Sequence, residues 1–168
     1  ANGGKALVDC ADEDRPETLN RAFDAGVGMM VTICTRLSRF EAIKEIAEMD
    51  DRLYCSVGIH PHQVAEEETA TFEALVSRAA HPKVVGIGET GLDYYYDSSP
   101  RDDQATSFRT HIAAARETGL PLIVHTRDAD EDMVAILRDE AGKGAFPCVL
   151  HCFSSSRPLA EAALELGF

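Results

Sequence analysis

Polar residues follow one apolar segment after another along this sequence, and that pattern constrains the fold more than any other feature. Six apolar segments, each as long as a strand, alternate with stretches of helical periodicity. The segments are residues 6–9, 29–34, 54–59, 84–88, 121–125 and 148–151. Strands that are apolar throughout are buried on both faces, so the pattern predicts a parallel sheet covered by helices.

The stretches between these segments place apolar side chains on one helical face, as core-facing helices do. The predicted helices begin near Pro16, Ser38 and Ser156, and three others carry apolar stripes that include Phe72, Phe108 and Met133. Residues 38–41, Ser-Arg-Phe-Glu, have the spacing of a capping box, which predicts that Ser38 caps its helix.

Polar residues at many strand ends favour a barrel over an open, doubly wound sheet. They are Asp9, His60, His62, Glu89, His125 and His151. A barrel builds its active site from the carboxyl ends of successive strands, whereas a doubly wound sheet concentrates its site at one switch point. We therefore predict an α/β chain with a TIM-type (β/α)8 barrel, of which about six βα units are present in a single domain over residues 1–168.

Charge and cysteine usage limit the partners and the compartment. The net charge of −13 argues against a broad duplex-binding surface, although a nuclease that meets phosphate through metal ions remains compatible with it. The five cysteines form no CxxC pair, and Cys34, Cys55 and Cys148 lie inside apolar segments, which favours a reducing, cytoplasmic location. The apolar segments are far shorter than the roughly 20 residues that cross a bilayer.

Glu89, His125 and His151 form the main candidate site. Each comes directly after an apolar segment. Alone, each would be interpreted as a turn acid or a structural histidine, but three at equivalent strand ends predict a metal site. One carboxylate and two imidazoles suit Zn, Mn, Fe or Co and leave positions open for water and substrate.

Two further features leave alternatives open. His60 and His62, separated by a proline, are either metal ligands or residues that pack at the rim. Arg127 either binds an anionic group with its planar guanidinium or pairs with Asp128 or Asp130.

Four segments resemble successive motifs of the TatD family of metal-dependent deoxyribonucleases, and together they span most of the chain. They are residues 58–62 (GIHPH), 88–94 (GETGLDY), 120–128 (LPLIVHTRD) and 151–154 (HCFS). The family is a branch of the amidohydrolase-like barrels, and its members are often 3′-5′ exonucleases. The resemblance implies a hydrolase that cleaves phosphodiester bonds with metal-activated water, acting on single-stranded DNA or DNA ends.

The same resemblance implies residue roles. Glu89 would be catalytic and bridge two divalent metal ions (Mg, Mn or Zn), and His125 and His151 would complete one of the two metal positions. His62 and Arg127 would face the substrate phosphate.

The sequence departs from the family pattern at two places. Asp9 matches the start of an Asp-x-His-x-His motif, but Ala-Asp-Glu-Asp follows at residues 11–14, and the family's late aspartate would lie beyond Phe168. We therefore expect residues to be missing between Cys10 and Ala11 and after the C-terminus, and this chain by itself to be a poor catalyst. The alternatives are a hydrolase of another ester or amide bond, such as an aminoacyl ester on RNA, and a non-catalytic TatD-like binding protein.

Overall fold

The computed structural model describes residues 14–68 and 70–168, which form a five-stranded sheet with helices between the strands. In chain order the elements are α1 (Arg15–Asp24), β1 (Met30–Thr32), η3 (Leu37–Arg39), α2 (Phe40–Ala47), β2 (Leu53–Val57), η4 (Pro61–Gln63), α3 (Phe72–Ala79), β3 (Val84–Asp93), α4 (Arg101–Thr118), β4 (Leu122–Arg127), α5 (Asp130–Lys143), β5 (Cys148–Leu150) and α6 (Arg157–Glu165). The predicted strand at residues 6–9, with Asp9, lies outside the described residues.

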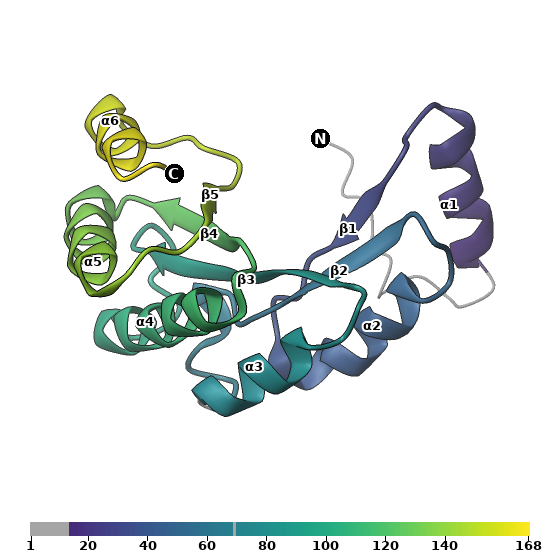
Figure 1. The fold of residues 1–168 in the computed structure, drawn as a ribbon, viewed down its shortest axis with the longest axis horizontal. Helices are drawn as coiled ribbons and strands as arrows, with labels where there is room; N and C mark the ends of the chain where they lie inside the picture. Colours follow the sequence, from purple (N-terminus) through teal and green to yellow (C-terminus); the bar gives the residue numbers. More distant parts are fainter. Residues whose placement is uncertain (1–13, 69) are drawn as a thin grey trace.

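The sheet has the strand order of a barrel. Its order is β1-β2-β3-β4-β5, and every neighbouring pair is parallel. A doubly wound sheet would reverse its order at a switch point and carry helices on both faces. Here the strands follow one another without reversal, and Figure 1 shows α2, α3, α4 and α5 along the outer side of a curved sheet. The predicted α/β barrel-type fold is confirmed, although the sheet is not closed within the described part of the chain.

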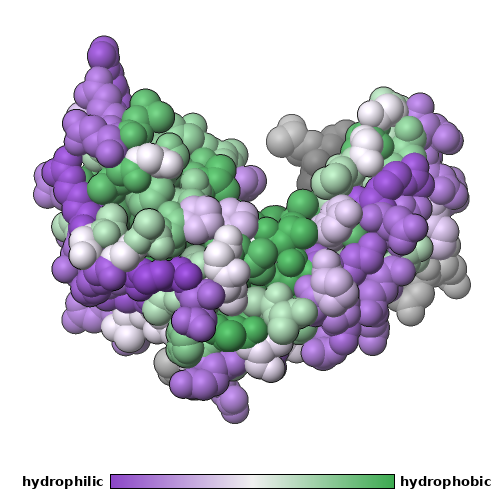
Figure 2. All heavy atoms as spheres, in the orientation of Figure 1, coloured by the Kyte–Doolittle hydropathy of each residue, from purple (hydrophilic) through white to green (hydrophobic). Residues whose placement is uncertain are grey.

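The two faces of the sheet differ in what covers them. In β4, Leu122, Val124 and Thr126 are buried, while Ile123, His125 and Arg127 on the opposite face are only partly buried. This alternation follows from the two-residue period of a strand. The core therefore lies between the sheet and the outer helices, and Figure 2 shows the molecule hollowed between the part that carries α5 and α6 and the part that carries α1 and β1.

The predicted helices are observed, but the cap at Ser38 is wrong. Ser38 lies in η3, one turn before α2, and both its hydroxyl and its N–H donate to the carboxylate of Glu67, at 2.6 and 2.8 Å. Hydrogen bonds to an ionised carboxylate are stronger than those to neutral groups, so this distant partner replaces the predicted local one. Hydroxyl caps do begin α3 and α6, where Thr71 and Ser156 accept from backbone N–H groups.

Three cysteines, Cys34, Cys55 and Cys148, behave as small apolar residues. Cys34 and Cys55 are free thiols within the core, and Cys148 is free and packs against it. Burial raises the pKa of the Cys55 thiol to about 11 and that of Cys148 to about 12, so both stay protonated near neutral pH. Among the described helices, none combines the length and the apolar character that a bilayer crossing requires.

Candidate metal centre

Strand β3 carries Glu89 in its middle, not at its end as predicted. The strand continues past Gly88 to Asp93, because Gly88 and Gly91 accept φ angles of +138° and +140° that other residues rarely adopt. Gly88 pairs with Ile123 and Thr90 with Val124, so Glu89 is an extra residue on β3. A bulge of this kind re-aims one side chain without ending the sheet.

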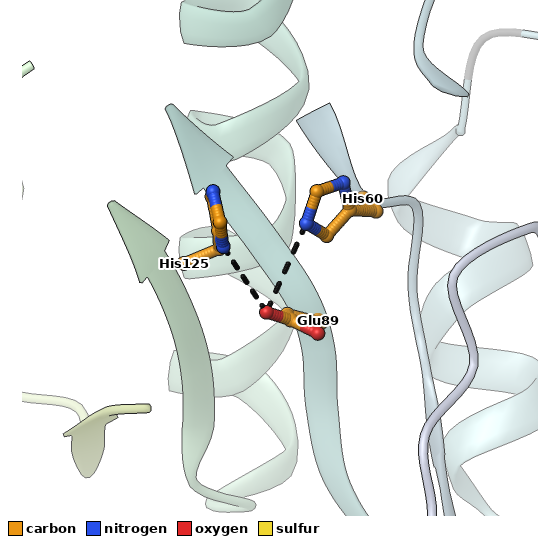
Figure 3. Close-up of side chains that lie close together, drawn as sticks. All are labelled: His60, Glu89 and His125. Carbon is orange, nitrogen blue, oxygen red and sulfur yellow. Dashed lines mark ion pairs between the residues drawn. The ribbon is translucent and has the colours of Figure 1, made fainter. Parts of the chain in front are cut away.

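The bulged Glu89 lies between two histidines (Figure 3). Its Oε1 is 3.3 Å from Nδ1 of His125 and 3.8 Å from Nε2 of His60, and the residue is only 9% exposed. Two ligands bound to one transition metal ion at about 2.1 Å lie roughly 3–3.5 Å apart. The separation between Glu89 and His125 fits that requirement as it stands, and these three side chains form one of the potential metal-ligand groups among the described residues.

Asp93 is a second buried carboxylate behind this pair. It has no exposed surface, and its Oδ2 accepts from Nε2 of His62 at 2.7 Å and from Nε2 of His125 at 2.8 Å. Its Oδ1 accepts from the backbone N–H groups of Tyr95 and Tyr96 at 3.1 and 2.9 Å. Burial acts to raise the pKa of Asp93, but these hydrogen bonds outweigh it and lower the pKa to about 2.

The hydrogen bonds distinguish the two histidines beside Glu89. Because Nε2 of His125 donates a hydrogen bond to Asp93, the neutral form of His125 carries its lone pair on Nδ1, which faces Glu89. His60 has the opposite arrangement, since its Nδ1 accepts from the backbone N–H of His62 at 3.2 Å. Its neutral form therefore directs an N–H toward Glu89. The neutral form of His125 can bind a metal through Nδ1, whereas His60 is better suited to donate a hydrogen bond.

Electrostatics keeps Glu89 charged in a buried position. Burial acts to raise the pKa of Glu89, but a hydrogen bond from the protonated form of His125 and the nearby His60 hold it below the ordinary value. For His125, burial acts to lower the pKa, and the two carboxylates outweigh it and raise the pKa. Burial, aided by the neighbouring His125, lowers the pKa of His60 to about 4, so His60 is neutral at pH 7.

A cavity of about 1100 Å³ opens at the carboxyl ends of β3, β4 and β5. Glu89, His125, His151 and Arg127 all line it. His151 follows β5, and its N–H donates to the carbonyl of Val124 at 2.8 Å, but its exposed imidazole is not in any ligand group found among the described residues. Its role as a ligand therefore stays a prediction.

The two residues predicted to meet the phosphate lie beside the same cluster. His62 is bound to Asp93, and the guanidinium carbon of Arg127 lies 3.8 Å from the ring centre of Tyr95. Within residues 14–68 and 70–168, Arg127 forms no ion pair with Asp128 or Asp130, which was the alternative interpretation. Arg127 is therefore held by aromatic contacts and lines the cavity.

Asp93 is the site residue that sequence reasoning missed. The segment from residue 88 to 94 carries part of the family resemblance, but the sequence alone gave no role to its aspartate. The available signal was the spacing of four between Glu89 and Asp93, which places both side chains on one face of a continuous strand. That signal was hidden because the strand was predicted to end at Gly88.

The fold and the site together define a protein of the TIM-barrel type with a buried carboxylate–imidazole cluster at the carboxyl edge of its sheet. Residues 7–168 match the family described as TatD related DNase, and the chain belongs to this family. The chain is 39% identical over 160 residues to the uncharacterized metal-dependent hydrolase YabD of Bacillus subtilis, covering 94% of this chain and 61% of that protein. It is 34% identical over 157 residues to the 3′-5′ ssDNA/RNA exonuclease TatD of Shigella flexneri, covering 92% of this chain and 59% of that protein.

Solved structures agree with the fold. The TatD homologue YjjV of Escherichia coli superposes with a TM-score of 0.81 at 28% identity, covering 92% of this chain and 60% of that one. A TatD family hydrolase of Entamoeba histolytica gives a TM-score of 0.77 at 24% identity, covering 99% of this chain and 57% of that one, and supports the fold alone. The chain thus spans between 57% and 61% of the length of these relatives.

Replacing Asp93 with asparagine is expected to weaken divalent-metal binding by about 10- to 100-fold, the usual effect of losing the carboxylate behind a metal-binding histidine. The amide has only one acceptor oxygen for the donors that Asp93 now satisfies, so His125 loses the partner that keeps its lone pair on Nδ1. Calorimetric titration with Mn²⁺ measures the change. Asp139→Asn, an exposed carboxylate on α5, is the control and should bind Mn²⁺ as the unaltered protein does. Unchanged Mn²⁺ affinity in Asp93→Asn would contradict the role given to this carboxylate.

Proposed function

We propose that this chain supplies the catalytic cavity of a divalent-metal-dependent hydrolase that cleaves phosphodiester bonds, a deoxyribonuclease of the 3′-5′ exonuclease type. The observation that carries the proposal is the pairing of the buried Glu89 with the partly buried His125, with Asp93 behind them, at the edge of a large cavity. The names of the relatives support it, since one is called a metal-dependent hydrolase and another a 3′-5′ ssDNA/RNA exonuclease.

The donor set supports a divalent metal. Glu89 offers a charged oxygen and His125 an imidazole lone pair, and His151 lines the cavity as the third candidate ligand. Two ions, of Mg, Mn or Zn, are the proposed complement, and Glu89, His125 and His151 would be among the residues that hold them. A divalent ion held here would lower the pKa of a bound water and polarise a phosphoryl oxygen.

The remaining residues orient the substrate in this proposal. Arg127 lines the cavity and presents guanidinium N–H donors to a phosphate. His62, bound to Asp93 beside the cluster, is the second proposed phosphate contact. The Nε2–H of His60 points toward Glu89 and steadies that carboxylate in its charged form. Catalysis in this arrangement depends on a preorganised set of donors more than on any mobile group.

We further propose single-stranded DNA or DNA ends as the substrate and the cytoplasm as the location. The chain carries a net charge of −13, which disfavours wrapping of a duplex. The free, buried thiols of Cys34 and Cys55 are compatible with a reducing compartment.

Metal removal tests the proposal. A 5′-labelled single strand incubated with the protein and Mg²⁺ or Mn²⁺ should shorten one nucleotide at a time from its 3′ end. Excess EDTA should reduce the rate at least about 100-fold, because the activation of water depends on the ion. Added Mg²⁺ or Mn²⁺ should restore the rate. An EDTA-resistant rate, or hydrolysis of an aminoacyl ester in place of DNA, would contradict the proposed reaction.

A further inference from the structure

Two exposed tyrosines lie beside the metal-ligand cluster. Tyr95 and Tyr96 follow β3, with 56% and 57% of their surface exposed, and their ring centres are 4.8 Å apart in an edge-to-face arrangement. The guanidinium carbon of Arg127 lies 3.8 Å from the ring centre of Tyr95 and 4.9 Å from that of Tyr96. We call these three side chains the Tyr–Arg platform.

The platform is continuous with the site. The ring of Tyr96 meets the ring of His62 edge-to-face, with the centres 5.1 Å apart. The backbone N–H groups of both tyrosines donate to Oδ1 of Asp93, whose other oxygen holds His62 and His125. One buried carboxylate therefore fixes both the candidate metal ligand and the turn that carries the aromatic rings.

The charges around the cavity indicate which kind of contact must supply the affinity for a nucleic-acid strand. Four carboxylates line the cavity beyond the cluster, from Asp128, Asp130, Glu131 and Asp132. Arg127 and Arg101 are its only arginines in the described part of the chain. A polyanionic strand gains little from long-range attraction to such a surface. Its affinity must then come from contacts that do not depend on phosphate charge, and stacking of bases on aromatic rings is such a contact.

We propose that the Tyr–Arg platform stacks an unpaired nucleobase next to the phosphodiester that the site cleaves. The inference rests on the proposed nuclease function and names what the site recognises besides phosphate. Flat aromatic faces and a guanidinium accept the π-face of any base, so recognition is independent of sequence. In a duplex the base faces are covered by their neighbours, and the platform therefore selects single strands or frayed ends.

Binding of matched oligonucleotides tests the platform. Short single strands with a non-hydrolysable terminal linkage are compared with and without the bases of their last two nucleotides, by fluorescence anisotropy with Mg²⁺ present. The unaltered protein should bind the base-bearing strand at least about tenfold more tightly than the abasic strand. The double variant Tyr95→Ala/Tyr96→Ala should lose this ratio while its affinity for the abasic strand stays the same.

Two controls separate stacking from structural effects. Tyr95→Phe/Tyr96→Phe keeps the rings and should keep the ratio. Phe23→Ala removes a different aromatic ring, one covered by Arg52 just before β2 begins, and should also leave the ratio unchanged. The stacking proposal would be overturned if the unaltered protein bound both strands equally. It would also be overturned if the alanine variant lost affinity for both strands to the same extent.

Failure of the platform and failure of the proposed function give different results. If the protein hydrolyses single strands but the alanine variant keeps the base-to-abasic ratio, the platform is wrong and the nuclease function stands. If no strand is hydrolysed but the ratio depends on the tyrosines, the platform binds bases and the proposed reaction is wrong.

Discussion

Replacing Glu89 with glutamine is expected to abolish divalent-metal binding and to lower kcat/KM for single-stranded DNA about 1000-fold. That factor corresponds to about 4 kcal/mol of lost transition-state stabilisation. Glutamine fills the same volume, so the loss isolates the charge. Glu89 is the one carboxylate that faces the lone pair of His125, and no other described carboxylate lies in its ligand group with His60 and His125. Electron paramagnetic resonance of bound Mn²⁺ gives a readout that does not depend on activity.

Glu140 provides a matched control for Glu89. It is also a buried carboxylate, 5% exposed, but its partners are Arg109, Arg116 and Lys143. Glu140→Gln leaves these cations without their shared carboxylate and should lower the free energy of unfolding, while Mn²⁺ binding stays unchanged. If Glu89→Gln bound Mn²⁺ and cleaved DNA as the unaltered protein does, the assignment of the site would be wrong.

The order of the elements could be predicted because it depends on local pattern. Apolar segments of strand length and helical stripes are properties of neighbouring residues. Five of the six predicted strands correspond to β1–β5, and the remaining one, at residues 6–9, lies outside the described residues. The choice of a barrel came from polar residues at many strand ends, and the unreversed strand order agrees with it.

The parts that could not be predicted depend on distant partners. Ser38 has the spacing of a local cap but binds Glu67, which is 29 residues away. The role of Asp93 depends on its hydrogen bonds with His62 and His125, which are 31 and 32 residues away. The glycines of β3 predicted a strand end, because glycine ends many strands and no local signal distinguishes a bulge from a turn.

Those glycines set the limits on what β3 can tolerate, and Gly91 is the extreme case. Gly91 pairs with His125 across β3 and β4, and a Cβ added to it would overlap the carbonyl oxygen of His125, at well under 3.0 Å. Its φ of +140° is also one that a residue with a side chain rarely adopts. The obstacle is backbone in the middle of the sheet, so no side-chain rotation can relieve it.

Gly91→Ala is therefore expected to lower the free energy of unfolding by at least about 4 kcal/mol, a large part of the roughly 5–15 kcal/mol that typically stabilises a domain. Two other glycines calibrate the effect in the same urea titration. Gly119, with a φ of +70° at the end of α4 and no atom within 4 Å of where a Cβ would lie, should cost only about 1 kcal/mol on replacement by alanine. Replacing Gly142, which lies in α5 with open space around it, by alanine should raise the free energy of unfolding by roughly 0.5 kcal/mol.

Gly91 also links the fold to the site. It lies between Glu89 and Asp93 on the same face of β3, where the chain must pass close to His125 for both carboxylates to reach that imidazole. A variant that stayed folded by moving β3 away from β4 would separate these groups. Gly91→Ala should therefore lose Mn²⁺ binding even under conditions where it is still folded. If it matched Gly119→Ala in stability and kept its Mn²⁺ affinity, the close approach of the two strands would not be what holds the site together.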